Sequence, residues 1–315
     1  MSAVLDMHSR NLRTVPVFQR EDVAFQSQGT TCRAWLYRPA RSATTRTACI
    51  VMAHGLGGTR AAGLEPFAER FAANGHAVLL FDYRHFGASD GAPRQLLTVG
   101  RQLDDWRAAI RHARTLPGVD PARVALWGTS LSSGHVLTIG AEDSGVAAIS
   151  AQNPMTDGLA TVLHLIRNAG LWHLCKLAAL GLVDQLRALL GLSPLLLPIV
   201  GRVGQTATLN AAGAYEKYLA IADASWRNQM SARLALTLGL YRPSTKAQRL
   251  RCPVLIQACM EDTVVSAPAA VALARRIPRA ELKQYACMDH FSIYAGNDFE
   301  RAVGDQLRFF HKTIA

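Results

Sequence analysis

The chain has 315 residues, half of them hydrophobic and 18% charged, enough for one large α/β domain or two ordinary ones. Its formal charge of +11 comes mostly from arginines scattered singly among acids, without like-charge runs, so we expect no nucleic-acid partner. Six cysteines without C-x-x-C spacing and an N-terminus without an uninterrupted apolar segment predict a cytoplasmic protein that lacks disulfides and a metal site.

Strand-like and helix-like segments alternate over the first half of the chain. Residues 22–29 and 31–39 predict an antiparallel pair with a turn near Gly29. Apolar runs typical of strands in a sheet covered on both faces follow at 48–55, 76–83, 123–128 and 146–152. Helices are expected between them, over 64–73, over 98–116 and directly after Ser130.

The alternation stops after residue 153. Only helical segments are predicted from there to residue 248, over 157–169, 171–191, 213–224 and 226–240. Residues 171–200 are strongly apolar, but Lys176, Asp184 and Arg187 interrupt them, so we expect buried helices and no stable membrane insertion, with a lipid-touching surface as the lesser alternative. A homodimer through this apolar segment remains open.

Strand–helix alternation resumes near the C-terminus. Strands are predicted at 252–260 and 280–288, and helices at 267–276 and 297–313. Repeating βα units imply a mostly parallel, doubly wound sheet of about eight strands. We therefore predict an α/β core made of residues 1–153 and 249–315, with residues 154–248 inserted as an all-helical cap. The cap would cover the carboxyl ends of the strands, where open parallel sheets bind ligands.

Ser130 stands where a catalytic serine would be presented. The segment RVALWGTSLSSG (123–134) predicts a strand, a sharp turn and a helix, the context of a nucleophile elbow. The usual pattern is G-x-S-x-G, and here Ser132 replaces the second glycine with another small residue. A serine in an ordinary tight turn is the alternative. The glycine-rich HGLGG (54–58) follows another core strand and can supply an oxyanion donor, or be a plain turn.

A serine nucleophile needs a base and a group that orients the base. Of ten histidines, His290 follows a late strand and precedes the last helix, so its loop can reach the edge of the sheet; His54 is the best rival. Asp262, in the loop after the strand 252–260, is the predicted acid, with Asp157 as runner-up. The order serine, aspartate, histidine is the order expected for this fold.

Five motifs together resemble the α/β-hydrolase superfamily: HGLGG, DYRHFGASDG (82–91), GTSLS, PVLIQACMED and DHF. The likeness covers residues 20–150 and 250–315. More narrowly, DYRHFGASDGAPR and the ending HFSIYAGNDFERAVGDQLRFF are similar to a bacterial and fungal subgroup of hydrolases, thiohydrolases and polyketide transferases. The chain departs from the family at Ser132 and at Cys259, where a glycine is usual.

This resemblance implies a role for each candidate residue. Ser130 would be the nucleophile, His290 the base and Asp262 its orienting acid, with the amides of Leu56 and Leu131 as the oxyanion hole. The candidate pocket residues are His54, Gly55, Gly57 and Thr129.

The expected activity is hydrolysis of a carboxylic ester or thioester of a largely apolar small molecule, through an acyl-enzyme and without a metal or organic cofactor. The alternatives are acyl transfer to an alcohol or amine, a cofactor-free haloperoxidase or C–C hydrolase, and a non-catalytic ligand-binding protein.

Overall fold

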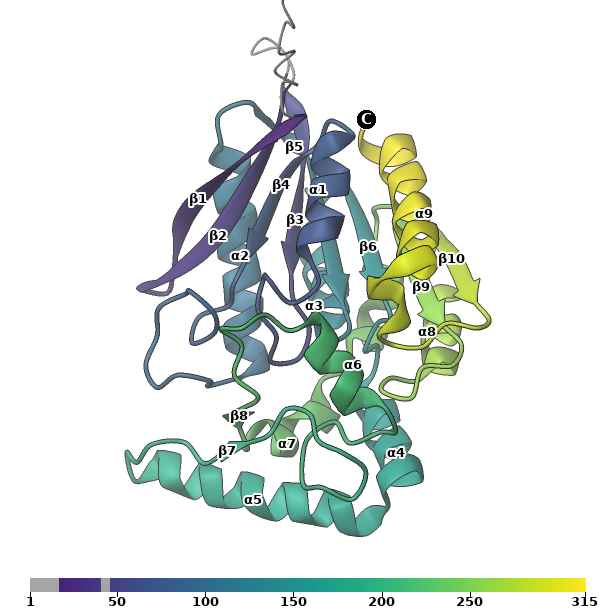
Figure 1. The fold of residues 1–315 in the computed structure, drawn as a ribbon. Helices are drawn as coiled ribbons and strands as arrows, with labels where there is room; N and C mark the ends of the chain where they lie inside the picture. The colour runs from purple at the N-terminus through teal and green to yellow at the C-terminus, as the bar shows by residue number, and fades with distance from the viewer. Residues whose placement is uncertain (1–16, 41–45) are drawn as a thin grey trace, which may run out of the picture.

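A computed structural model describes residues 17–40 and 46–315. Its centre is an eight-stranded sheet with the strand order β1-β2-β4-β3-β5-β6-β9-β10 (Figure 1). The strands from β4 to β10 in this order run parallel, and β1 and β2 form an antiparallel edge. Their bounds are β1 Phe18–Ser27, β2 Thr30–Pro39, β3 Thr47–Ala53, β4 Ala77–Phe81, β5 Val119–Thr129, β6 Ala148–Gln152, β9 Val254–Cys259 and β10 Ala280–Tyr285. The predicted mostly parallel sheet is confirmed.

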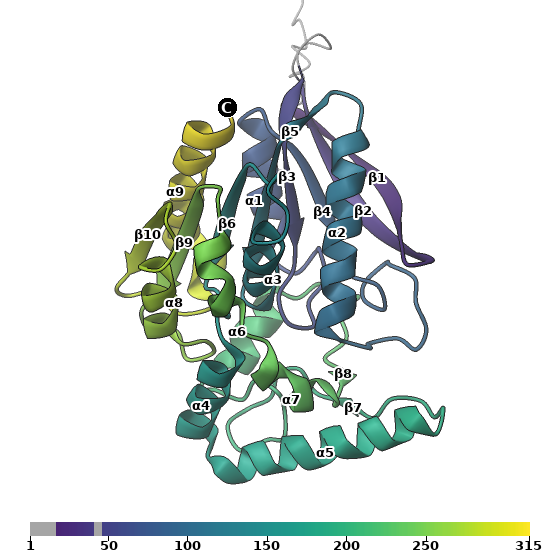
Figure 2. The same cartoon turned by 180° about the vertical axis from the view of Figure 1, so that it is seen from behind.

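Helices cover both faces of the sheet. Helices α1 (Glu65–Ala73) and α9 (Gly296–Ile314) lie on the face toward the viewer in Figure 1. Helices α2 (Val99–Thr115), α3 (Leu131–Gly140) and α8 (Ala267–Ala274) lie on the opposite face (Figure 2). Because helices cover both faces, every residue of β4, β6 and β9 is buried, including the polar residues Ser150, Gln152 and Gln257; only β4 is apolar throughout.

The motif at residues 82–91 ties loops together inside the fold. The buried Asp82 carboxylate accepts hydrogen bonds from the amides of Arg60 (2.7 Å) and Ala88 (3.0 Å). Gly87 has φ +50°, and a Cβ there would lie 2.4 Å from the Asp82 carboxyl carbon, so glycine is required. Asp82 and Gly87 of this motif therefore hold the loop after β4.

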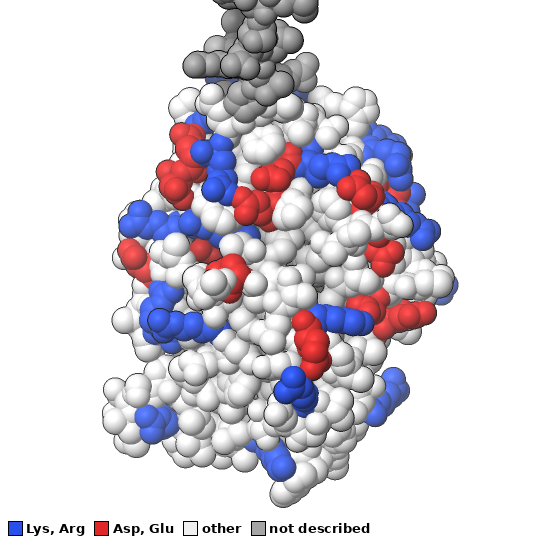
Figure 3. Space-filling model, in the orientation of Figure 1, with Lys and Arg blue, Asp and Glu red and all other residues white. Residues whose placement is uncertain are grey.

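The chain between β6 and β9, which we call the insert, forms a layer over the carboxyl ends of the strands. It contains α4 (Gly158–Ala169), α5 (Leu171–Leu189), α6 (Ala214–Ile221), α7 (Leu234–Thr237) and two 3₁₀ helices (Leu238–Leu240 and Pro243–Arg249). A further 3₁₀ turn at Ser292–Tyr294 precedes α9. Charged side chains are spread over the sheet domain, whereas the end formed by the insert is mostly uncharged (Figure 3).

The second half of the insert departs from the predicted helices. The helix expected over 226–240 is interrupted, because β8 (Met230–Ser231) pairs with β7 (Leu196–Leu197) in a separate two-stranded sheet. The Ser231 amide also donates to the Gln95 carbonyl (2.9 Å) of the core. The pairing with β7 and the contact with the core fix residues 230–231 in an extended conformation. Among the residues that the structure describes, no helix is long and apolar enough to cross a membrane.

Candidate active site

Ser130 occupies a strained turn between β5 and α3. Its backbone has φ 56° and ψ −121°, a positive φ that residues with a side chain seldom adopt. The Ser130 amide donates to the Gln152 carbonyl (2.9 Å), and the Met155 amide donates to the Ser130 carbonyl (3.0 Å). These bonds hold the turn at the carboxyl edge of the sheet and at the N-terminus of α3. The geometry is that of a nucleophile elbow.

Small residues around Ser130 allow the sharp turn. A Cβ on Gly128 would lie 2.5 Å from the Ser132 carbonyl oxygen, so only glycine fits there. Ser132, which replaces the second glycine of the usual pattern, is fully buried, and its Oγ lies 2.9 Å from the Tyr83 hydroxyl. That hydroxyl in turn accepts a hydrogen bond from Trp106 Nε1 (2.8 Å). The extra hydroxyl is thus accommodated by a buried polar partner.

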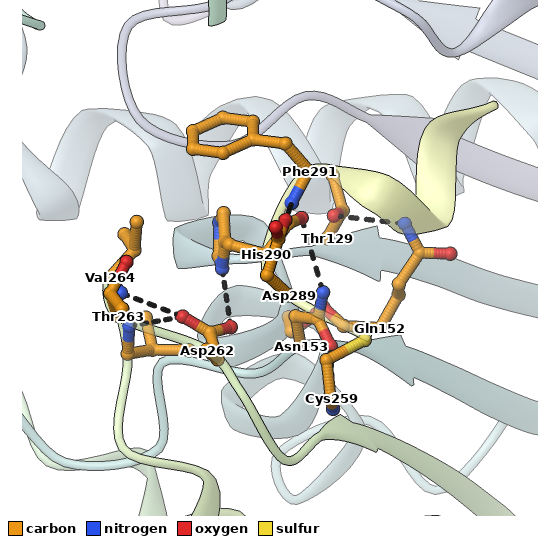
Figure 4. Close-up of polar contacts among 12 residues, drawn as sticks. Thr129, Gln152, Asn153, Cys259, Asp262, Thr263, Val264, Asp289, His290 and Phe291 are labelled. Atoms are coloured by element: carbon orange, nitrogen blue, oxygen red, sulfur yellow. Dashed lines mark hydrogen bonds and ion pairs between the residues drawn. The ribbon is translucent and has the colours of Figure 1, made fainter. Parts of the chain in front are cut away.

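His290 and Asp262 form a buried pair beside this turn (Figure 4). His290 Nδ1 lies 2.6 Å from Asp262 Oδ2. The other carboxylate oxygen, Oδ1, accepts from the amides of Val264 (2.7 Å) and Val265 (2.8 Å). Since an ionised carboxylate only accepts hydrogen bonds, Nδ1 carries the proton and Nε2 is the basic nitrogen of the ring. The amides fix the carboxylate, and the carboxylate fixes the imidazole.

Asn153 connects the loop of the acid with the loop of the base. Its Oδ1 accepts from the Cys259 amide (3.1 Å) at the end of β9, and its Nδ2 donates to the His290 carbonyl (3.3 Å; Figure 4). The side chain is buried, and its φ of 42° lies in the left-handed region, which asparagine adopts more readily than most residues. Sequence reasoning missed this residue. The one feature of the sequence that could have indicated it is the position of this amide side chain directly after the core strand β6.

The two rival residues have other partners. His54 is buried with Nδ1 donating to the Gly55 carbonyl (3.0 Å), and burial lowers the pKa of its ring to about 4. Asp157 is the N-cap of α4, where it accepts from the Leu159 amide (2.9 Å) and pairs with Arg242 (2.8 Å). Neither residue is part of a carboxylate–imidazole pair. The contacts of Asp157 are structural, whereas His54 Nε2 has no hydrogen-bond partner among the described residues.

Ser130 lies at the junction of two cavities. The larger cavity is apolar and lies between the sheet edge and the insert. Its volume is about 1040 Å³ when the space at its open mouth is included. Its walls include Leu56 and Leu131 beside Ser130, together with aliphatic residues of α4 and α5. The smaller cavity is lined by His290 and by the predicted pocket residues His54, Gly55 and Thr129. The structure therefore brings Ser130, His290 and most predicted pocket residues together.

Two aromatic residues of the insert hold the glycine-rich loop (residues 54–58) in place. A Cβ on Gly55 would lie 3.0 Å from Ser130 Cβ, which shows how closely the loop approaches the serine. The Tyr218 hydroxyl donates to the Leu56 carbonyl (2.9 Å), and Trp226 Nε1 donates to the Gly57 carbonyl (2.9 Å). The two aromatic rings stack with their centroids 4.7 Å apart. Sequence reasoning missed both residues, because nothing in the insert sequence indicates what it contacts.

Gly57 lies away from the two cavities that Ser130 lines. It borders a separate polar hollow with Thr59 and Trp226. It also packs against Ile199 of the insert, since a Cβ at Gly57 would come within 2.4 Å of the Ile199 side chain. Its φ of +61° and this close approach both require glycine.

Comparison with known proteins agrees with this architecture. The family model described as serine aminopeptidase, S33, matches residues 44–292. The chain is 43% identical over 295 residues to the quorum-quenching protein AidA of Acinetobacter baumannii, covering 93% of this chain and 95% of that protein. It is 34% identical over 200 residues to polyketide transferase ATR5 of Stachybotrys chlorohalonatus, covering 63% and 62% of the two chains.

Among solved structures, the alpha/beta hydrolase GrgF from a Penicillium species superposes with a TM-score of 0.78 at 24% identity, covering 94% of this chain and 99% of that one. The eight-stranded sheet, the elbow at Ser130 and the family match lead to one conclusion. The chain is a member of the α/β-hydrolase superfamily, in the family described as serine aminopeptidase, S33.

Proposed function

We propose that the protein hydrolyses carboxylic esters or thioesters with an apolar acyl group, through an acyl-enzyme on Ser130. The observation that carries the proposal is the buried His290–Asp262 pair, 2.6 Å apart, whose His290 lines the same cavity as Ser130. A serine hydroxyl needs such a base to become nucleophilic at neutral pH. The relative named polyketide transferase supports acyl chemistry of this kind.

Each residue then has one task. Ser130 Oγ attacks the carbonyl carbon while His290 Nε2 accepts its proton, and the imidazolium is stabilised by Asp262. The amides of Leu56 and Leu131 stabilise the oxyanion of the tetrahedral intermediate. His290 then returns the proton to the leaving alcohol or thiol. Water attacks the acyl-enzyme in a second round, with His290 again as the base, and Ser130 is released.

The substrate class is inferred from the two cavities. The larger one is lined mainly by Leu, Val, Ala and Met side chains, which suit an aliphatic acyl chain or a lactone with an apolar tail. Within the described residues, no Asp or Glu lines either cavity next to Ser130. An aminopeptidase needs such acids to hold the ammonium group of its substrate. We therefore propose esters over peptides, despite the description of the family.

Acyl transfer to an alcohol or amine is the second candidate. It is favoured by one observation, namely that two cavities meet at Ser130: the acyl chain can occupy one while an acceptor enters the other. The relative named polyketide transferase agrees with this reading. Product analysis in the presence of a competing alcohol separates the candidates, because a transferase gives the new ester where a hydrolase gives the acid.

The test compares Ser130→Ala with Ser144→Ala, a control serine exposed in the turn after α3. A fluorophosphonate probe should label the wild type and Ser144→Ala but not Ser130→Ala. Turnover of p-nitrophenyl esters of increasing chain length should fall by about 10⁴-fold or more in Ser130→Ala alone. Unlabelled folded wild-type protein would favour a non-catalytic binding role, and full activity of Ser130→Ala would exclude the acyl-enzyme.

A further inference from the structure

The outward face of the insert is unusually apolar. Among the described residues, sixteen large hydrophobic side chains are exposed to solvent. Eight of them lie within residues 171–192, on α5 and just after it. Trp172 is 73% exposed and Leu189 is 74% exposed. The eight are Leu171, Trp172, Leu182, Val183, Leu186, Leu189, Leu190 and Leu192. Proteins surrounded by water on all sides seldom expose a contiguous patch of this kind, so the face requires an explanation.

Helix α5 is firmly fixed on its other side. His173, Leu177, Gly181 and Asp184 recur every three or four residues and are buried against the rest of the insert. The Asp184 carboxylate binds the Arg233 guanidinium (2.8 and 2.9 Å) and accepts from the Leu195 amide (2.8 Å). These contacts therefore fix the orientation of α5 about its own axis. In this orientation the exposed apolar residues point away from the rest of the insert.

The charges around this face have one sign. Arg167, Lys176 and Arg187 are the basic residues of α4 and α5, and the single acid of the two helices, Asp184, is buried and paired. The Lys176 ammonium lies 5.6 Å from the centre of the Trp172 ring. In Figure 3 the lower end of the molecule, where Figure 1 places α5, shows isolated blue side chains and no red ones. The face thus combines apolar area, a tryptophan and positive charge.

We propose that this face, the apolar side of α5 with Lys176 and Arg187, docks on an anionic lipid surface. A helix that lies in a membrane interface has this composition: leucines and tryptophan enter the headgroup–acyl boundary, and lysine and arginine contact anionic headgroups. With 19 residues, α5 is about 28 Å long and rests along the surface without spanning it. A second copy of the chain fits less well, because two such basic faces would meet without an acid to pair them.

Lipid docking also gives the apolar cavity a source of ligand. Leu174 and Leu177 of α5 line the larger cavity beside Ser130. The same helix therefore separates this cavity from the lipid surface on its outer side. Apolar acyl compounds concentrate in membranes by the hydrophobic effect, so docking would place the cavity next to them.

The experiment measures binding of the full chain to vesicles by flotation. The vesicles contain phosphatidylcholine alone, or phosphatidylcholine with about one third phosphatidylglycerol. We expect binding to the anionic vesicles to be about tenfold tighter, and to weaken strongly at about 0.5 M NaCl, because salt screens charge attraction. Trp172→Glu/Leu189→Glu should reduce binding at least tenfold.

The matched control adds the same charge at the far end of the molecule. Val17→Glu/Gln19→Glu changes two exposed positions at the start of β1, which both cartoons place opposite α5. It should bind vesicles like the wild type, and circular dichroism and turnover of a water-soluble ester should be unchanged in both double variants. Absence of vesicle binding, or equal loss in the control, would overturn the proposal. A dimer seen by light scattering without lipid and abolished by Trp172→Glu/Leu189→Glu would assign the face to a second copy instead.

Discussion

The assignment of the acid can be tested by neutralising each candidate aspartate in turn. In Asp262→Asn the side chain would still accept from Val264 and Val265, but its amide group would face His290 Nδ1. An amide N–H cannot accept from Nδ1–H, so the imidazole would turn to the wrong tautomer or lose its partner. A change of this kind reduces kcat by about 10⁴-fold, or about 5 kcal/mol of activation free energy. Stopped-flow or continuous assay of p-nitrophenyl ester turnover measures the loss.

The matched variant is Asp157→Asn. Asp157 caps α4 and bonds Arg242, whose side chain is 48% exposed, and the Ser244 hydroxyl. Replacing the Asp157 carboxylate should reduce the free energy of unfolding by about 1–2 kcal/mol, measured by urea denaturation, and leave kcat within about threefold of the wild type. The reasoning is refuted if Asp262→Asn keeps more than about a tenth of the activity while Asp157→Asn loses most of it.

Three further predictions concern the surroundings of the site. Ser132→Gly should lower the free energy of unfolding in urea by about 1–2 kcal/mol, because the Tyr83 hydroxyl loses one of its two buried partners and keeps only Trp106. It should leave kcat nearly unchanged, and a large fall in kcat would show a direct role for Ser132. Tyr218→Phe frees the Leu56 carbonyl and should lower kcat about tenfold with little change in KM; an unchanged kcat would show that the loop is held without this bond. Burial lowers the pKa of His135 in the folded protein to about 3, whereas in the unfolded chain it is about 6.5. As pH falls below about 6.5, the unfolded chain therefore takes up a proton that the folded chain does not, and the free energy of unfolding decreases. His135→Gln should reduce this slope by up to about 1.4 kcal/mol per pH unit in unfolding titrations, and an unaltered slope would contradict the low pKa.

The parts of the site that follow core strands could be predicted from the sequence. Ser130, Asp262 and His290 each come directly after a strand-like run, and in a parallel sheet the carboxyl ends of such strands meet at one edge. The elbow was recognisable despite Ser132, because the turn depends on small residues more than on the second glycine. The structure adds a fact that spacing cannot give: Asp262, and not Asp157, is the carboxylate that contacts the imidazole.

The parts that depend on long-range contacts could not be predicted. Residues 226–240 have apolar residues at helical spacing, yet Ser231 is held by Gln95 and pairs with β7, so tertiary contacts override the local pattern. Strands of two residues, such as β7 and β8, are too short to show periodicity. Asn153 and Tyr218 act through partners more than a hundred residues away, and no local motif indicates such partners.

The hydrogen bonds from Tyr218 and Trp226 to the glycine-rich loop have a consequence for how substrate reaches Ser130. An insert that swung away as a hinged lid, taking α6 with it, would break both bonds and release the loop that carries the Leu56 amide. Opening in that manner would displace the proposed oxyanion donor each time. We therefore expect the side of the insert near α6 to stay in place, and substrate to enter on the opposite side, where α4 and α5 border the larger cavity. On this expectation, one part of the insert holds the glycine-rich loop and the other admits the substrate.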